Sequence, residues 1–145
     1  MIIFDLDGTL ALDEHRVHFL RETPKRWGEY FAACAGDELN WPIFNILRMF
    51  AERGDRCVIW TGRSAEVQVT TEQWLKKYGI LDLIAEFRMR AEGDHTDDNE
   101  LKRSWLRHAI AQGHHPYLVF EDRKRVVDMW REEGLVCCQV APGDF

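Results

Sequence analysis

Short apolar runs alternate along the chain with longer stretches in which apolar residues recur every three or four positions. Short runs bounded by polar turns are typical of buried strands, and the longer spacing is typical of amphipathic helices. Strands are predicted at Met1–Phe4, Arg56–Trp60, Leu83–Met89, Tyr117–Phe120 and Leu135–Val140. Helices are predicted at Glu14–Arg21, Lys25–Ala35, Pro42–Arg53, Ser64–Tyr78, Glu100–Gln112 and Arg123–Glu133. This alternation predicts an α/β fold with a mostly parallel five-stranded sheet.

Length and composition narrow the class of protein. A chain of 145 residues with 46% hydrophobic residues fits one domain, 1–145, with a real core. The formal net charge of −6 argues against a protein that coats long nucleic acid, so any nucleic-acid contact is expected to be local. No apolar run approaches the roughly 20 residues of a membrane span, and no secretory signal is visible. The four cysteines lack CxxC spacing, which predicts reduced thiols and a cytoplasmic location.

Polar clusters follow three of the predicted strands directly. The first strand is followed by DLDGT at positions 5–9, the second by TGRS at 61–64, and the fourth by EDR at 121–123. In a parallel sheet, ligands bind outside the carboxyl ends of the strands. We therefore expect these three clusters to converge on one site, together with Lys102 from the first turn of a predicted helix.

These residue types suit phosphoryl transfer. Asp5 can attack phosphorus to give an acyl-phosphate that water then removes, and Asp7 can act as the acid and base. Thr61 and Lys102 can hold the phosphoryl oxygens where negative charge accumulates. An oxygen-rich site for Mg²⁺ is predicted at Asp5, Asp7, Glu121 and Asp122. Without a cation, carboxylates within about 4 Å would repel by roughly 4 kcal/mol per pair at an effective dielectric constant of about 20.

Each cluster alone also has an ordinary explanation. The DLDGT segment can be a simple turn, although the further ligands of a calcium-binding EF-hand loop are missing. Glu121 and Asp122 can cap the helix that follows, and Lys102 can be a surface lysine. The order of the clusters and their common position at strand ends favour the catalytic interpretation.

The same clusters resemble the four motifs of the haloacid dehalogenase (HAD) superfamily. The resemblance implies a three-layer α/β/α domain of the HAD-like Rossmannoid type, an aspartyl-phosphate intermediate and Mg²⁺. It also implies that Asp5 is the nucleophile, and that Asp7 is the acid/base and gives its main-chain carbonyl to the metal. A small helical cap at about 13–50 is expected to shape the choice of substrate.

A closer resemblance covers almost the whole chain, namely to the 3′-phosphatase domain of phage-type polynucleotide kinase–phosphatase. The C-terminal stretch EDRKRVVDMWREEGLVCCQVAPGDF at 121–145 is its most specific part, although Glu121 replaces the usual Asp. The resemblance implies a substrate-binding role for Arg16, Arg63, Arg90 and Asp98. The implied substrate is a 3′-phosphorylated nucleic-acid end or nucleoside 3′-phosphate.

Two other functions stay open at this point: a general phosphatase of 5′-nucleotides or small molecules, and a non-catalytic phosphate-binding module. The chain lacks the G-x-x-x-x-G-K-[ST] phosphate loop, so a separate kinase or ligase is the expected kind of partner. A basic-aromatic segment at 25–27 can stack a base, but burial of Trp27 is the favoured interpretation. Trp41 is likewise expected in the core, and membrane contact is not expected.

Overall fold

The computed structural model describes residues 1–143, whose centre is a five-stranded sheet in the order β5-β4-β1-β6-β7. Every neighbouring pair in this sheet is parallel. The strands are β1 (Ile2–Phe4), β4 (Cys57–Ser64), β5 (Glu86–Arg90), β6 (Leu118–Arg123) and β7 (Val136–Gly143). The predicted α/β fold with its parallel sheet is confirmed, although the strand expected from residue 83 begins at Glu86, after a 3₁₀ turn, η3 (Leu81–Leu83).

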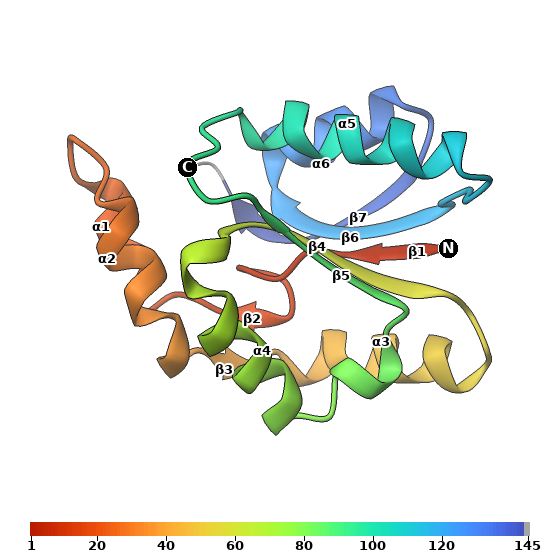
Figure 1. Ribbon diagram of the computed structural model, residues 1–145, viewed down its shortest axis with the longest axis horizontal. Helices are drawn as coiled ribbons and strands as arrows, with labels where there is room; N and C mark the ends of the chain where they lie inside the picture. Colours follow the sequence, from red (N-terminus) through yellow and green to blue (C-terminus); the bar gives the residue numbers. More distant parts are fainter. Residues whose placement is uncertain (144–145) are drawn as a thin grey trace.

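Helices cover both faces of the sheet and produce three layers (Figure 1). One face carries α3 (Trp41–Glu52) and α4 (Gln68–Lys77), and the other carries α5 (Asp98–Ala111) and α6 (Lys124–Glu132). A short 3₁₀ turn, η2 (Ala65–Val67), precedes α4, and Ser64 caps it by accepting a hydrogen bond from the Glu66 N–H.

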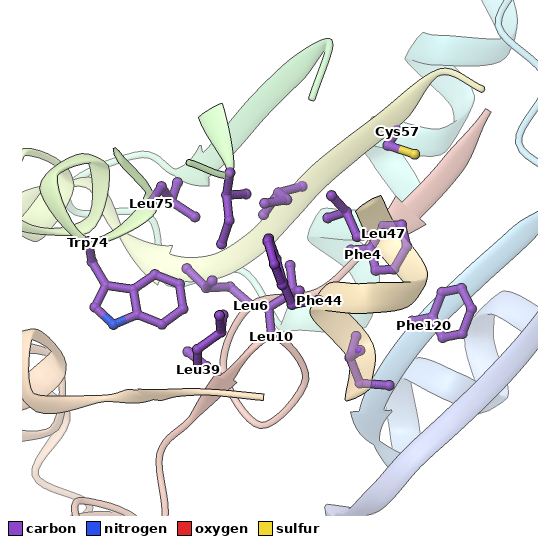
Figure 2. Packing of buried hydrophobic residues seen from close by; sticks show 14 of the residues in the cluster. Phe4, Leu6, Leu10, Leu39, Phe44, Leu47, Cys57, Trp74, Leu75 and Phe120 are labelled. Carbon is purple, nitrogen blue, oxygen red and sulfur yellow. The ribbon is translucent and has the colours of Figure 1, made fainter. Parts of the chain in front are cut away.

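The strands contain runs of consecutive apolar residues, and successive side chains of a strand point to opposite sides. Both faces of the sheet are therefore apolar. In β1, Ile2 and Phe4 belong to the core cluster under α3 and α4, whereas Ile3 belongs to the cluster under α5 and α6. Figure 2 shows the first cluster, in which Phe4, Leu47 and Phe120 lie together. The rings of Phe4 and Phe120 stack with their centroids 4.8 Å apart, which ties β1 to β6.

A small helical unit lies beyond the carboxyl ends of the strands (Figure 1). It contains α1 (His18–Arg21), α2 (Trp27–Ala32) and a 3₁₀ helix, η1 (Ala33–Gly36). An unpredicted antiparallel pair, β2 (Ala11–Leu12) and β3 (Glu38–Leu39), joins this unit to the sheet domain. Helix α3 falls within the 13–50 range expected for the cap, but its buried residues pack in the core under the sheet. The cap boundaries therefore stay a prediction, and this packing favours an end near residue 37.

Two tryptophans depart from the expected burial. Trp41, at the first position of α3, has 58% of its surface exposed, and Trp27 has 38% exposed. Both predictions of burial are wrong, because each residue is the first of its helix and packs on only part of its surface. Among residues 1–143, no helix has the length and apolar character needed to cross a bilayer. The last two residues of the C-terminal pattern, 144 and 145, lie outside the described residues.

Candidate active site

Strand register brings the ends of β1 and β6 together. Phe4 pairs with Phe120 on one side and with Ile59 on the other, and the Asp5 N–H donates to the Phe120 carbonyl at 2.9 Å. The residues that follow Phe4 and Phe120, Asp5 and Glu121, therefore lie at the same edge of the sheet. This register places Asp5 beside Glu121, as the sequence analysis predicted for residues so far apart in the chain.

Lys102 connects these two carboxylates. It is the fifth residue of α5, only 1% of its surface is exposed, and its Nζ lies 2.6 Å from Asp5 Oδ1 and 2.8 Å from Glu121 Oε2. Asp98 Oδ2, one helical turn earlier, is 3.6 Å away. Burial alone would lower the pKa of Lys102, but the charges of Asp5, Asp98 and Glu121 raise that pKa well above its ordinary value. The side chain is thus a fixed cation rather than a solvated surface lysine.

We call Asp5, Glu121 and Asp122 the acidic cluster. One oxygen from each of these buried residues lies within 4.8 Å of the others. Burial and the charge of Glu121 raise the pKa of Asp122 to about 10, and the same two causes raise the pKa of Asp5 well above its ordinary value. Such shifts indicate a surplus of negative charge that one lysine does not neutralise.

Gly8 allows the acidic cluster to close around the turn after β1. Its backbone φ is +76°, in the left-handed region that favours glycine, and a Cβ there would lie 2.2 Å from Asp122 Oδ2. Any side chain at this position would collide with that carboxylate. The glycine of DLDGT is therefore required both by the turn and by the approach of Asp122.

A second group, which we call the arginine cluster, lies on the cap side of the site and consists of Asp7, Asp37, Arg16 and Arg63. Arg16 and Arg63 both donate to Asp7 Oδ1 through Nη2. The same two guanidiniums reach Asp37 Oδ2, at 2.6 Å from Arg16 and 3.0 Å from Arg63. Both arginines are at least 99% buried, and their guanidinium groups donate hydrogen bonds to other groups of the protein.

The arginine cluster fixes the ionisation of Asp7. Burial opposes ionisation, but the charges of Arg63 and Arg16 outweigh it and hold the pKa of Asp7 well below its usual range. Tyr30, from the cap, also places its ring 4.1 Å from the Arg16 guanidinium. Asp7 is consequently a carboxylate held between cap and sheet domain, and its side chain is not among the oxygens of the acidic cluster.

Asp37 is the residue of this site that the sequence analysis missed. It follows η1 at the return from the cap, its side chain is fully buried, and its carbonyl accepts a hydrogen bond from Trp74 Nε1 at 2.8 Å. No strand precedes it and no motif surrounds it. The only signal in the sequence is a pair of acids, Asp37 and Glu38, after Gly36, which is too weak to single out Asp37.

Arg90 supports the site from β5. It donates from Nε to the Gly62 carbonyl at 2.9 Å, and its Nη2 lies 3.3 Å from Asp98 Oδ1. It also donates to the Thr96 carbonyl, so its guanidinium organises the loop before α5. Thr61 is completely buried, and its hydroxyl accepts the Arg63 N–H at 3.1 Å. Most of the predicted site residues surround one space, and only Lys102 and Arg16 lie behind its lining; the residues that line it are Asp5, Asp7, Thr61, Arg63, Arg90, Asp98, Glu121 and Asp122.

This space is a cavity of about 560 Å³. Its walls come from both clusters, from the β4 and β6 ends, and from the cap helix α2. A cavity of this size is within the range of roughly 300–1,000 Å³ that small-molecule sites occupy. It is larger than a phosphate group requires.

Comparison with known proteins agrees with this geometry. A chain in the Pnkp1/Rnl/Hen1 complex matches 99% of this chain with 32% identity and a TM-score of 0.83, and 46% of that chain is covered. A haloacid dehalogenase-like family hydrolase from Streptococcus pneumoniae matches 94% of this chain at 16% identity and a TM-score of 0.63, with 81% of its own length covered; at that identity it shows the fold alone.

Sequence comparison gives the family. The protein named putative bifunctional polynucleotide kinase/RNA ligase of Autographa californica nuclear polyhedrosis virus is 27% identical over 132 residues, which are 90% of this chain and 18% of the viral protein. The chain therefore spans less than half the length of this viral protein and of the matching chain in the Pnkp1/Rnl/Hen1 complex. The family model for the phosphatase domain of polynucleotide kinase PNKP matches residues 1–145. The chain belongs to this family of HAD-type phosphatase domains.

Proposed function

We propose that this phosphatase domain removes the 3′-phosphate from nucleic-acid ends or nucleoside 3′-phosphates with Mg²⁺, through a phosphoryl group carried on Asp5. The observation that supports this proposal most is the contact of 2.6 Å between Lys102 Nζ and Asp5 Oδ1, at the edge where Glu121 and Asp122 gather. A buried carboxylate held by a fixed cation is a suitable nucleophile for phosphorus.

The donor set of the acidic cluster fits Mg²⁺. All of its candidate ligand atoms are carboxylate oxygens, which hard divalent cations prefer. The raised pKa values of Asp5 and Asp122 are those expected of a group that lacks its counter-charge. Asp5, Asp122 and Glu121 would hold the ion, with the Asp7 main-chain carbonyl as a further donor. When bound, the ion supplies positive charge that offsets the charge on the transferring phosphoryl group.

The reaction takes place in two displacements. An Asp5 oxygen forms a bond to phosphorus while the bond from phosphorus to the substrate oxygen breaks, and the leaving alkoxide takes a proton. Water then attacks the phosphorus, the bond from phosphorus to the Asp5 oxygen in the acyl-phosphate breaks, and inorganic phosphate leaves. The charge of Lys102 lowers the pKa of Asp5 against the effects of burial and Glu121, so Lys102 and a bound cation together would favour the ionised nucleophile. Lys102 also donates to the phosphoryl oxygens, with the Thr61 hydroxyl as a second donor.

Asp7 is the acid and base of this scheme. Its carboxylate state serves the second displacement directly, because water must lose a proton there. The first displacement needs a protonated Asp7, which the guanidiniums of Arg16 and Arg63 oppose. We expect the substrate phosphate to loosen these contacts, since it offers the two arginines another anion. Arg16 and Arg63 would then bind the substrate phosphate in place of Asp7, which is their role in substrate binding.

Substrate preference tests the proposal most directly. We expect kcat/KM for 3′-phosphorylated oligonucleotides and nucleoside 3′-monophosphates to exceed that for nucleoside 5′-monophosphates by about tenfold or more, a difference of about 1.4 kcal/mol. A preference for 5′-monophosphates would instead establish the general nucleotidase function. Treatment with EDTA should abolish turnover and added Mg²⁺ should restore it, whereas full activity of a metal-free preparation would exclude Mg²⁺.

The nucleophile has a matched pair of variants. Asp5→Asn should lower kcat by about 10⁴-fold or more, because no oxygen anion remains to attack phosphorus. Asp82→Asn changes an exposed acid in η3 and should leave kcat unchanged. Phosphate release by Asp5→Asn at the normal rate would rule out the covalent mechanism.

We also propose that a separate kinase or ligase works with this domain. The relatives that support this are a polynucleotide kinase/RNA ligase and a member of the Pnkp1/Rnl/Hen1 complex. A 3′-phosphorylated nick should become sealable by a ligase only after incubation with the active domain, and not with Asp5→Asn. The four free cysteines support a cytoplasmic location, which we retain as a proposal.

A further inference from the structure

The cap brings an aromatic side chain to the mouth of the catalytic cavity. Trp27 is the first residue of α2 and lines the same cavity as Asp5. Its exposed fraction is 38%, so one part of the indole packs and another part faces the cavity opening. Phe31, one helical turn later, also lines the cavity, and its ring centroid lies 5.8 Å from that of Trp27 at an angle of 29°. The two rings form an aromatic wall that a planar group can extend.

Positive groups flank this wall from two parts of the chain. Lys25 Nζ and the Arg123 guanidinium each lie 5.8 Å from the Trp27 ring centroid. Arg125, at the start of α6, lines the cavity with half of its side chain exposed. Arg125 Nη1 also lies 3.6 Å from Asp97 Oδ1, and Arg123 Nη1 lies 3.7 Å from Asp98 Oδ2, so both arginines have acidic neighbours at the cavity. Arg26 pairs with Glu22 and Glu29 and does not line the cavity.

The distribution of charge makes this region distinctive. The chain carries a net charge of −6, which repels a polyanion at a distance. Cationic side chains beside an aromatic ring, at the mouth of a cavity that ends at a nucleophile, are the combination used to bind single-stranded nucleic acid. The cavity of about 560 Å³ has room for a nucleotide and not only for its phosphate.

Resting on the proposed 3′-phosphatase function, we propose that Trp27 stacks a nucleobase at the 3′ end of the substrate while the terminal phosphate lies at Asp5. Arg125 then meets a backbone phosphate on the 5′ side of that base. Stacking is available to every base, so this contact selects nucleic-acid ends over small phosphomonoesters without reading sequence. It gives the cap a specific role in substrate selection.

The test compares two substrates on matched variants. The substrates are a short 3′-phosphorylated single-stranded oligonucleotide and a small aryl phosphate, and the measurement is the ratio of their kcat/KM values. Trp27→Ala should lower this ratio about tenfold, which corresponds to about 1.4 kcal/mol. Trp27→Phe should retain most of the ratio because phenylalanine keeps a stacking surface. Trp41→Ala removes a more exposed tryptophan that does not line the cavity and should leave the ratio unchanged.

Binding of the unphosphorylated oligonucleotide gives a second measurement that does not depend on turnover. It should quench the indole fluorescence of the wild type more than that of Trp27→Phe, and Arg125→Ala should weaken the salt dependence of binding by a slope of about 1. Equal loss of activity toward both substrates in Trp27→Ala would overturn the proposal and assign Trp27 a purely structural role. An unchanged ratio would overturn it as well. A wild type that prefers 5′-monophosphates would instead refute the proposed function itself.

Discussion

The two halves of the site contain the same kinds of groups in different proportions. The arginine cluster sets two carboxylates, Asp7 and Asp37, against two guanidiniums. The acidic cluster sets three carboxylates against the single ammonium of Lys102. Both halves are largely buried, although 16% of the Asp7 side chain is exposed, so water screens neither of them well.

This difference explains the opposite pKa shifts of Asp7 and Asp122, although burial opposes the ionisation of both carboxylates. In the arginine cluster, Asp7 ionises more readily than a free aspartate, while in the acidic cluster Asp122 holds its proton to a pH of about 10. In the arginine cluster the two positive and two negative charges are equal, so its ion pairs can hold the four side chains in place without a further ion. The acidic cluster has a surplus of negative charge in spite of Lys102, and a divalent cation would offset that surplus.

Removal of the one fixed cation from the acidic cluster should have the largest effect. Lys102→Met keeps the length of the side chain but leaves Asp5 and Glu121 without their ammonium partner. We expect kcat to fall by about 10³-fold or more, since a donor to the phosphoryl oxygens and a charge that lowers the pKa of Asp5 are both lost. Steady-state kinetics at saturating Mg²⁺ gives the measurement.

Lys76→Met is the matched control because Lys76 is exposed on α4 and should be neutral toward kcat. A fall of less than tenfold in Lys102→Met would show that the metal alone supplies the charge and that Lys102 only fills space. Circular dichroism on both variants separates loss of chemistry from loss of fold.

The next largest effect should come from unbalancing the arginine cluster. Asp37→Asn removes one of two carboxylates from a pair of buried guanidiniums, and breaking a buried ion pair costs about 3 kcal/mol. We expect the free energy of unfolding in urea to fall by that amount. We also expect kcat to decrease, because Arg16 and Arg63 then rest on Asp7 alone.

The control for this variant is Asp128→Asn, whose ion pair with Lys124 is largely exposed and should contribute little. An Asp37→Asn protein as stable as the wild type would mean that the arginine cluster is not balanced by Asp37. The comparison between the two halves would then fail.

The acidic cluster was predictable from the sequence, and the arginine cluster only in part. Asp5 and Glu121 directly follow apolar strands, and parallel strands necessarily bring their carboxyl ends to one edge. That rule needs only the strand pattern, so residues separated by most of the chain could be placed together. Lys102 required one further step, because a residue in the first turn of a helix lies at that same edge.

The insert that carries Arg16 and Asp37 offers no comparable rule. Its helices are short, and α1 begins at His18 where a helix from Glu14 was predicted. Mixed polar and apolar positions in 13–40 do not reveal which side faces the sheet, and the antiparallel pair of β2 and β3 has only two residues per strand. The orientation of this region depends on tertiary contacts such as that of Arg16 with Asp7. The local pattern of polar and apolar residues does not reveal such contacts.

A neutral isostere in each half should change the stability of the metal-free protein in opposite directions. Asp122→Asn removes one of three crowded carboxylates and should raise Tm in EDTA by about 4 °C. Asp7→Asn removes a carboxylate that two arginines stabilise and should lower Tm. Differential scanning fluorimetry measures both. Added Mg²⁺ should raise the Tm of the wild type more than that of Asp122→Asn, and an equal rise in both would place the cation elsewhere.

The smallest expected effect is the pH dependence of stability without metal, and its sign distinguishes the two halves. Asp122 has a pKa of about 10 in the folded protein, against about 3.9 for an aspartate in an unfolded chain. Between these values the folded state binds more protons than the unfolded state, so its stability falls as pH rises. Asp7 has the opposite shift, and its contribution is complete above a pH of about 4.

The acidic cluster therefore sets the sign of the pH dependence of stability in the metal-free protein. In EDTA, Tm should fall from pH 6 to pH 8 in the wild type and fall less in Asp122→Asn. With Mg²⁺ the slope should vanish or reverse, because the cation favours the ionised carboxylates and competes with protons for them. A wild-type Tm that rises with pH in EDTA would mean that the carboxylates of this half are already compensated within the chain, and the difference between the two halves would then have no role for a cation to fill.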